Sequence, residues 1–273
     1  MVQETLVRTD PVAVAPQRRR WSPSVVLWPL LGIVVTIAVW WLAVEIFDLQ
    51  TIILPSPPEV VDAFGRYPSL LLNATWGTTK ITLIGFALSV VVGVAIGAAI
   101  AAWKPFERAF APLLVALNAV PKVALAPLMI AWFGFGHTPV LAMAFLVCFF
   151  PIVLSTATGL TSTPADLAEL ARSLDATRLQ TFRRIRVPAA LPQFFTGLKL
   201  AMPLAVIGVA VGEMQSGAVD EGLGTIIVQT SGQGDTATAF AALTLMAIVS
   251  IVLYYALVWL ESISLPWVRG TTG

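Results

Sequence analysis

The sequence predicts an all-α integral membrane protein with six transmembrane helices, and two observations support this. Hydrophobic residues make up 58% of the chain and charged residues only 11%, whereas soluble domains contain about 25% charged residues. Apolar runs long enough to cross a bilayer as helices alternate with short polar or proline-rich intervals. The predicted spans are Val25–Phe47, Thr75–Trp103, Phe110–Phe135, Val140–Leu160, Leu191–Met214 and Ala237–Leu260.

A polar tail, residues 1–24, precedes the first span and contains the basic cluster Arg18–Arg20. The first span is too long for a typical signal-peptide core and lacks a convincing small-residue cleavage site. We therefore expect a retained span, with Trp40 and Trp41 in an interfacial aromatic belt. The membrane domain is expected over residues 25–265, followed by a tail over residues 266–273.

Prolines interrupt the chain after the first span. Pro55, Pro57 and Pro58 forbid a continuous helix in the stretch Ile53–Phe64. The chain is expected to restart there as a short surface helix over Glu59–Phe64, on the outer side of the membrane.

The second span carries glycines that favour close helix packing. These glycines are Gly85, Gly93 and Gly97. A short cytoplasmic turn is expected after it, and its charged residues are Lys104, Glu107 and Arg108.

The third span is predicted to be kinked or broken, because it contains three prolines, Pro112, Pro121 and Pro127. His137 follows it and is expected as an exposed histidine in a short outer turn. The chain has no second histidine with which to build a metal site.

The interval between the fifth and sixth spans, residues 215–236, is rich in glycine. It is predicted either to dip partly into the membrane or to form a short outer helix. Pro151 lies inside the fourth span, and Lys199, early in the fifth, is expected to extend to the cytoplasmic surface.

The charges favour a topology with both termini in the cytoplasm. An even number of spans places most basic residues on one side: Arg18–Arg20, Lys104, Arg108, Arg269 and five arginines between the fourth and fifth spans. The loops on the other side are mainly acidic, with Arg66 as the main exception. This arrangement agrees with the positive-inside rule.

The most distinctive stretch is Glu169–Pro188, a polar and arginine-rich interval within an expected cytoplasmic loop over residues 161–190. Apolar residues recur in it at helical spacing on both sides of Asp175. The pattern predicts two short amphipathic helices with a break near Asp175. Such a polar pair must lie on a membrane surface or against another protein.

This stretch resembles the cytoplasmic loop of bacterial ABC importer permeases. Their pattern is Glu-Ala-Ala, three residues, Gly, nine residues, Ile, one residue and Leu-Pro, and the spacing fits from Glu169 to Pro188. Leu170, Asp175 and Val187 depart from the pattern. Glycine adopts a left-handed backbone freely and Asp only tolerates it, so the local geometry at Asp175 is open to difference.

The resemblance extends from about Leu54 to Trp267. It includes the stretch ILPSPPEV, which is similar to permeases of the nitrate, sulfonate and taurine class, and the stretches PKVALAPL, WFGFG and PAALPQFFTGLKLA. It implies the architecture of a type I ABC importer permease with a coupling-helix loop. The implied partners are a second permease copy in a homodimer, two cytoplasmic ATPase subunits, an extracytoplasmic substrate-binding protein and the bacterial plasma membrane.

In that family the loop docks on the ATPase, whose closure rocks the spans from inward- to outward-facing. The resemblance therefore implies coupling residues here, namely Glu169, Leu170, Ala171, Leu174, Asp175, Ala176 and Arg178. The permease itself would need no cofactor, because the partner ATPase uses the ATP. The chain has no Gly-Lys-Ser/Thr phosphate loop with which to hydrolyse ATP alone.

Two ionisable residues are placed within the predicted spans, Lys122 and Glu213. Such groups are costly in hydrocarbon and usually face protein or an aqueous path. We expect a translocation path lined by Asn118, Lys122 and Glu213, with Asn118 one turn before Lys122 on the same face. The alternatives are that Lys122 satisfies carbonyls freed by a proline break or snorkels, and that Glu213 lies at the membrane interface.

Other classes of function are less well supported. A secondary transporter or channel would need no ATPase, but related halves and embedded charge pairs, which are common in such transporters, are not evident. The spans lack the polar groups of a membrane enzyme. A net charge of +1 without a basic patch argues against nucleic-acid binding, and the single Cys148 excludes an internal disulfide.

The substrate class implied by the resemblance is broad. It includes nitrate, taurine, alkanesulfonates, pyrimidine precursors of thiamine, related small heterocycles and aromatic acids. The stretches PKVALAPL and GEMQSGAVDEGLG favour the heterocycle branch.

Overall fold

The computed structural model describes residues 24–162, 169, 173, 175–216 and 222–267, and this part of the chain is helical. Five of its helices are long and apolar enough to cross a membrane, and a bent helix pair supplies a sixth span if it counts as one. The all-α membrane fold predicted from the sequence is therefore confirmed.

The elements are α1 (Ser24–Ile46), α2 (Pro57–Arg66), α3 (Pro68–Ala102), α4 (Lys104–Ala119), η1 (Lys122–Leu125), α5 (Ala126–Phe133), α6 (His137–Thr161), α8 (Arg178–Thr181), η2 (Phe182–Arg186), α9 (Val187–Ser216), α10 (Leu223–Gly232) and α11 (Thr236–Ser264).

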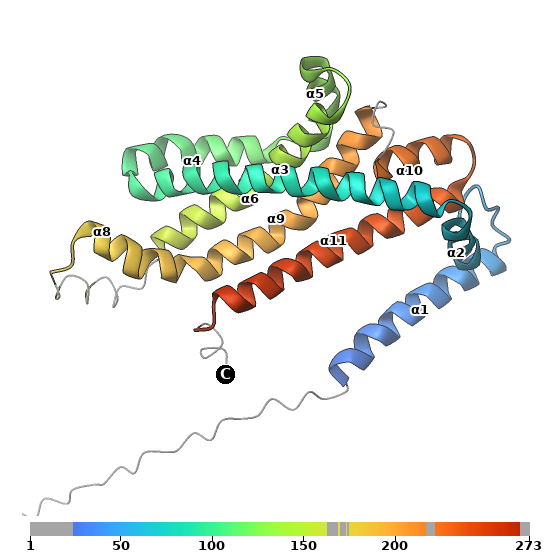
Figure 1. Cartoon of the computed structure of the whole chain (residues 1–273), viewed down its shortest axis with the longest axis horizontal. Coiled ribbons are helices and arrows are strands. Elements are labelled where there is room, and N and C mark those ends of the chain that lie inside the picture. The colour runs from blue at the N-terminus through green and yellow to red at the C-terminus, as the bar shows by residue number, and fades with distance from the viewer. Residues whose placement is uncertain (1–23, 163–168, 170–172, 174, 217–221, 268–273) are drawn as a thin grey trace, which may run out of the picture.

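Four long helices, α3, α6, α9 and α11, form the central bundle (Figure 1). The predicted close packing of the second span is confirmed at α3 and α6. A methyl group added at Gly85 or Gly97 would lie 2.7 Å from the side chain of Ala144 or Thr156, closer than side chains pack. Helices without side chains at these points approach each other closely, as is typical of membrane bundles.

The predicted third span is broken. Helices α4 and η1–α5 meet at an 84° bend. The break falls at Pro121, which has no backbone N–H to continue the helix, whereas Pro112 is accommodated inside α4. The expected turn at Lys104 and Arg108 is wrong, because α4 already begins at Lys104.

The chain before the bundle has a projecting helix, α1, and the short helix α2 (Figure 1). Helix α2 begins at Pro57, two residues before the predicted restart, and buries Val60 and Ala63. Ser56 caps it: its backbone N–H and hydroxyl donate to the Glu59 carboxylate at 2.7 and 2.9 Å. The hydroxyl of Thr51 donates to the same carboxylate at 2.7 Å.

The glycine-rich interval contains a short helix, α10 (Leu223–Gly232). A short helix was one of the two alternatives predicted for this interval. Ten residues give a helix about 15 Å long, which is half the thickness of the hydrocarbon core. Its first turn, Leu223–Ile226, is buried, and it contacts α3, α9 and α11. The next helix, α11, is capped by Asp235, whose carboxylate accepts from the Thr238 backbone N–H at 3.2 Å.

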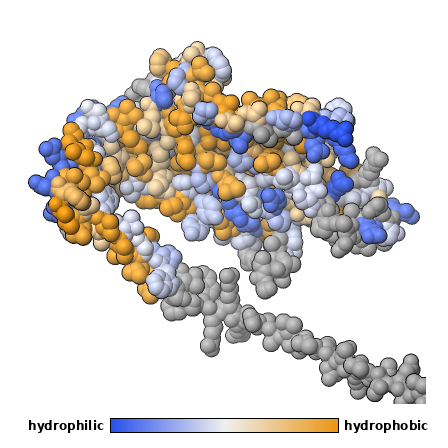
Figure 2. All heavy atoms as spheres, turned by 180° about the vertical axis from the view of Figure 1, so that it is seen from behind, coloured by the Kyte–Doolittle hydropathy of each residue, from blue (hydrophilic) through white to orange (hydrophobic). Residues whose placement is uncertain are grey.

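Much of the outer surface is apolar, as Figure 2 shows for one face. Large exposed side chains occur along α1, where Trp28, Val34 and Val39 are all at least 60% exposed. Exposed apolar surface on this scale is suited to lipid or to a partner rather than to water.

Candidate functional site

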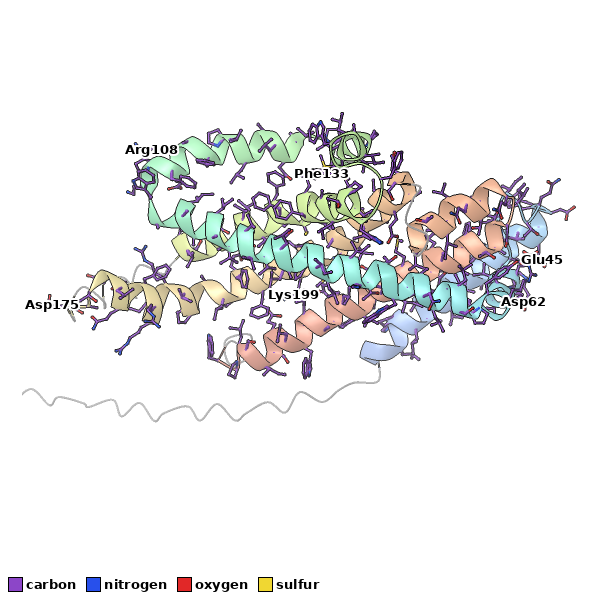
Figure 3. The ribbon with its side chains drawn as sticks, turned by 45° about the horizontal axis from the view of Figure 1, so that its top comes forward. Glu45, Asp62, Arg108, Phe133, Asp175 and Lys199 are labelled. Carbon is purple, nitrogen blue, oxygen red and sulfur yellow. The ribbon has the colours of Figure 1, made fainter. Side chains whose placement is uncertain are left out.

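The two ends of the bundle differ in chemistry. At one end lie Asp175, α8 and η2, and we call it the arginine end; at the other lie α2 and α10, and we call it the α10 end (Figures 1 and 3). Figure 3 shows Asp175 at the arginine end and Glu45 and Asp62 at the opposite end.

The arginine end presents basic and apolar groups together on its surface. Leu179, Gln180, Arg183 and Arg184 line a hollow of about 440 Å³. The side chain of Leu179 is 65% exposed, although leucine is normally buried. An exposed mixture of arginine and apolar side chains is typical of a contact surface for another protein.

Asp175 marks the predicted break in the helix pair. Its φ is +48°, in the left-handed region that the interpretation of a helix break requires. The next helix starts with a reciprocal cap: the Thr177 N–H donates to the Gln180 side chain at 2.9 Å, and the Gln180 N–H donates to the Thr177 hydroxyl at 3.3 Å. The spacing Thr-x-x-Gln is the sequence signal for this capping box, and the sequence analysis missed it.

The second amphipathic helix does not end before the fifth span. The helical chain runs from Leu179 to Ser216 without interruption, through a π-helical turn at Phe182–Arg186. The prediction of a separate short helix is therefore wrong on this side.

The expected coupling residues are only partly described. Glu169 and Asp175 are exposed, and Ala176 is half-buried. Leu170, Ala171 and Leu174 lie outside the described residues, as does the side chain of Arg178.

Asn118 and Lys122 lie together at the bend of the broken span. The Lys122 ammonium donates to the Asn118 backbone carbonyl at 3.0 Å and to its side-chain oxygen at 2.8 Å. It also lies 5.1 Å from the centre of the Phe150 ring on α6, a favourable cation–π distance. The shared face is confirmed, and the side chain of Lys122 satisfies the carbonyl that the break at Pro121 releases.

Glu213 belongs to a separate cluster at the α10 end. It is 0% exposed, so its carboxyl group is enclosed by protein and open to neither lipid nor water. The Thr78 hydroxyl on α3 lies 2.9 and 3.0 Å from its two oxygens. The Gly224 N–H on α10 donates to it at 2.8 Å.

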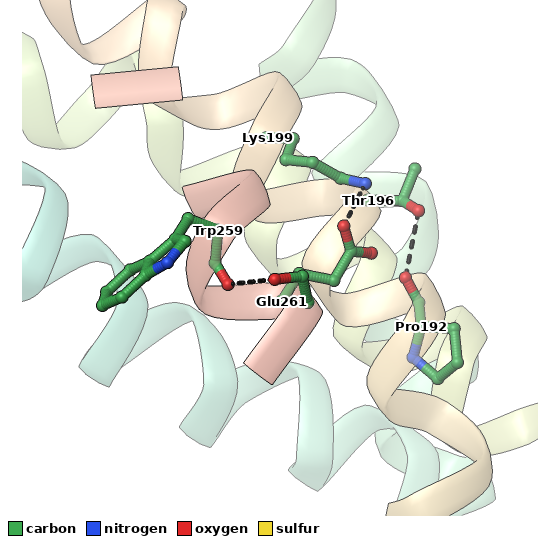
Figure 4. A network of polar contacts seen from close by, with 6 residues as sticks. Pro192, Thr196, Lys199, Trp259 and Glu261 are labelled. Carbon is green, nitrogen blue, oxygen red and sulfur yellow. Dashed lines mark hydrogen bonds and ion pairs between the residues drawn. The ribbon is translucent and has the colours of Figure 1, made fainter. Parts of the chain in front are cut away.

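A charge pair that the sequence analysis missed joins α9 to α11. The Lys199 ammonium lies 2.8 Å from a carboxylate oxygen of Glu261, and both side chains are 22% exposed (Figure 4). Lys199 therefore has an ionic partner on the neighbouring helix α11, and both side chains remain partly exposed. A pair 62 positions apart in the sequence has no local signal.

His137 is exposed, as expected, but it is the first residue of α6 rather than part of a turn. With Lys80 and apolar residues of α3 and α6 it lines a hollow of about 330 Å³. Within the described part of the chain, no three His, Cys, Asp or Glu residues are grouped as metal ligands would be.

Comparisons with known proteins agree with this architecture. Residues 89–270 match the family model described as binding-protein-dependent transport system inner membrane component. The chain is 37% identical over 242 residues to the formylaminopyrimidine transport permease protein of Halalkalibacterium halodurans, covering 88% of this chain and 96% of that one. It is also 37% identical over 246 residues to the riboflavin transport system permease protein of Chloroflexus aurantiacus, covering 88% and 91%.

The fold is also similar to a solved structure. A chain of the MetNI methionine ABC transporter, determined in inward-facing conformations, superposes with a TM-score of 0.59 at 20% identity. The match covers 72% of this chain and 95% of that one.

Proposed function

Because the chain belongs to the family of binding-protein-dependent transport system inner membrane components, we propose that it is the permease subunit of an ATP-driven importer. In this proposal it receives a small solute from an extracytoplasmic binding protein and conducts it across the bacterial plasma membrane. The family match over residues 89–270 carries the proposal. It includes the arginine end, the last part of α3 and all of α6, α9 and α11.

The proposed docking surface for the ATPase is the segment Glu169–Pro188. Its support is the exposed arginine end: a hollow bordered by Arg183 and Arg184, an exposed Leu179 and a left-handed break at Asp175. A charged, partly apolar projection beyond the membrane fits a groove on a soluble partner. We propose that two ATPase subunits bind a homodimer of this chain, with both termini in the cytoplasm.

The proposed translocation path passes Asn118 and Lys122. Their support is the 84° bend, which leaves polar backbone at a break between helices. Irregular backbone at membrane depth is tolerated where it lies within protein or beside a water-filled cavity. The Lys122 ammonium would bind a passing solute after it releases the Asn118 oxygens.

The proposed substrate is a small nitrogen heterocycle. The support is the 37% identity to two permease proteins whose names refer to formylaminopyrimidine and to riboflavin. Both molecules contain planar nitrogen-bearing rings. The corresponding measurement is the thermal shift of the binding protein encoded beside this chain, tested with pyrimidines, flavins, taurine and nitrate.

The function is tested by co-expression of the full chain with the ATPase encoded beside it. We expect the two to co-purify and to hydrolyse ATP together, while the chain alone has no activity above background. Glu169→Lys should reduce the co-purified ATPase by about tenfold, because it reverses a charge at the docking surface. Glu107→Lys, a change at another exposed glutamate, is the matched control and should retain the ATPase.

Two results would contradict the proposal. One is full transport by Glu169→Lys. The other is solute uptake that continues in vesicles without ATP, which would instead indicate a secondary transporter or channel.

A further inference from the structure

The Glu213 carboxylate connects three helices at the α10 end. Glu213 itself lies on α9, Thr78 on α3 and Gly224 on α10, and the bonds between them are 2.8–3.0 Å long. The Thr78 hydroxyl also accepts the Leu223 backbone N–H at 2.9 Å. Thr78, Glu213 and Leu223 are all 0% exposed. We call this cluster the Glu213 joint.

The first turn of α10 is shaped to receive this carboxylate. A methyl group added at Gly222 would overlap the Glu213 carboxylate, and one added at Gly224 would lie 2.9 Å from Glu213 Cβ and 2.7 Å from the Ala210 carbonyl. The N–H groups of Leu223 and Gly224 belong to the first turn of the helix, where intrahelical acceptors are missing. The carboxylate and the hydroxyl therefore supply partners that these two N–H groups would otherwise lack.

The geometry argues against direct contact between Glu213 and a solute. Both carboxylate oxygens already accept hydrogen bonds, and no part of the side chain reaches the surface. A group that binds a solute needs an open face, whereas this one is enclosed by three helices. Its partners change only if the helices themselves separate.

Helix α10 depends on this joint for its position. It is too short to span the membrane, so its position depends on its contacts with α3, α9 and α11. If α3 moved away from α9 and α10, Thr78 would leave the carboxyl group, and a buried polar group would lose a hydrogen-bond partner. Such a loss is costly unless water replaces the donors.

We propose that Glu213 and Thr78 are positioning residues that hold α10 against α3 and α9 and keep the α10 end closed. The joint opens, and water enters it, when this end opens for the solute. This proposal rests on the proposed function, because it assigns the α10 end to one of the two closures of an alternating-access importer. Glu213 then controls the path without lining it.

The test measures how often α10 leaves the bundle in the full chain in lipid nanodiscs. Ile226, a buried residue one turn into α10, is changed to Cys in a Cys148→Ala background, and its rate of reaction with a water-soluble thiol reagent is recorded. Val228→Cys, at a position 44% exposed, provides the reference for free access. Thr78→Val and Glu213→Gln each remove part of the joint with little change in shape.

The chain offers a matched control one turn away on α3. Thr82 is also 0% exposed, but its hydroxyl donates only to the Thr78 carbonyl of its own helix. Thr82→Val therefore removes a buried hydroxyl that contacts only the backbone carbonyl of Thr78, and it leaves the contacts of Glu213 and of α10 in place. Thr78→Ser retains the hydroxyl and is the rescue variant.

We expect Thr78→Val and Glu213→Gln to raise the labelling rate at Ile226→Cys by about tenfold, since each deprives a buried carboxyl group or N–H of a partner. Thr82→Val should change it by less than about twofold, and Thr78→Ser should label like the parent. Equal labelling of all variants at unchanged Tm would overturn the proposal. So would an equal rise in Thr82→Val, because it would show general loosening.

A measurement on the unmodified chain covers the case in which a variant does not fold. The Leu223 and Gly224 amides should show one common protection against hydrogen exchange, each relative to its free-amide rate, because a single opening releases both. Clearly different protection of the two amides would contradict a joint that opens as a unit. These experiments need no ATPase, so their outcome is separate from the co-purification test of the proposed function.

Discussion

The arginine end and the α10 end position their functional groups in opposite ways. At the arginine end the geometry is local: Asp175 turns the backbone, and Thr177 and Gln180 cap the next helix within a few residues. At the α10 end it is long-range, because Thr78 and Glu213 are 135 positions apart in the sequence. The first end is exposed and the second is enclosed.

This difference has a consequence for function. A locally determined surface keeps its shape while its surroundings move, which is suited to rigid docking of a partner. A joint built from three separate helices keeps its shape only while those helices stay together. The arginine end is therefore suited to transmit a movement, and the α10 end is suited to respond to it.

The largest effect is expected from crowding the enclosed end. Gly224→Ala places a methyl group 2.7 Å from the Ala210 carbonyl, so the backbone must shift. We expect a loss of about 1–3 kcal/mol in the free energy of unfolding. Gly232→Ala, in the same helix with nothing within 4 Å, is the control and should be neutral or slightly stabilising. Thermal unfolding of the full chain in nanodiscs measures both, and equal Tm values would show that the first turn of α10 is not tightly enclosed.

A smaller effect is expected at Asp175. Asp175→Gly should be tolerated in ATPase co-purification and transport, because glycine adopts positive φ freely. Asp175→Val should impair both, since a β-branched residue at this φ is destabilised by roughly 1 kcal/mol or more. The opposite order, with Val tolerated and Gly impaired, would mean that the arginine end does not rely on local backbone geometry.

The smallest effect is a pH dependence at the α10 end, where Glu59 caps α2. The hydroxyl of Thr51 and the backbone N–H of Ser56 hold the pKa of Glu59 below its usual value of 4.5. A lowered pKa in the folded state means that this contribution is present above the usual value and is lost as the pH falls through the lowered one. The protection of the Ser56 amide, taken against the exchange of a free amide at the same pH, should therefore decrease as the pH falls through the lowered pKa. Glu59→Gln should show the lower protection already at neutral pH and lose this dependence; an unchanged dependence would contradict the assignment.

Much of the fold was predictable from the sequence, because the requirement for long apolar helices in a membrane is strong. A break in the proline-rich third span and the packing glycines followed from the chemistry of single residues. The choice of Pro121 for the break and the continuous helix from Leu179 through α9 did not, since both depend on how these segments pack against the bundle.

The candidate site was predictable only where its geometry is local. The positive φ of Asp175 and the contact between Asn118 and Lys122 follow from nearby residues. The burial of Glu213 and the pairing of Lys199 with Glu261 do not. Helices that are apolar on every side carry no periodic signal to show which face meets which neighbour, so contacts between spans are hidden in the sequence.

The continuous helix from Leu179 to Ser216 has a mechanical consequence. Its 38 residues form a rod about 57 Å long, with the arginine hollow at one tip and Glu213 one turn from the other. A tilt of about 5° around its middle swings each tip by about 2.5 Å in opposite directions. That displacement nearly equals the length of the hydrogen bonds at Glu213. If this helix tilts as one body, a small push at the arginine end is therefore enough to break the Glu213 joint at the other end of the bundle.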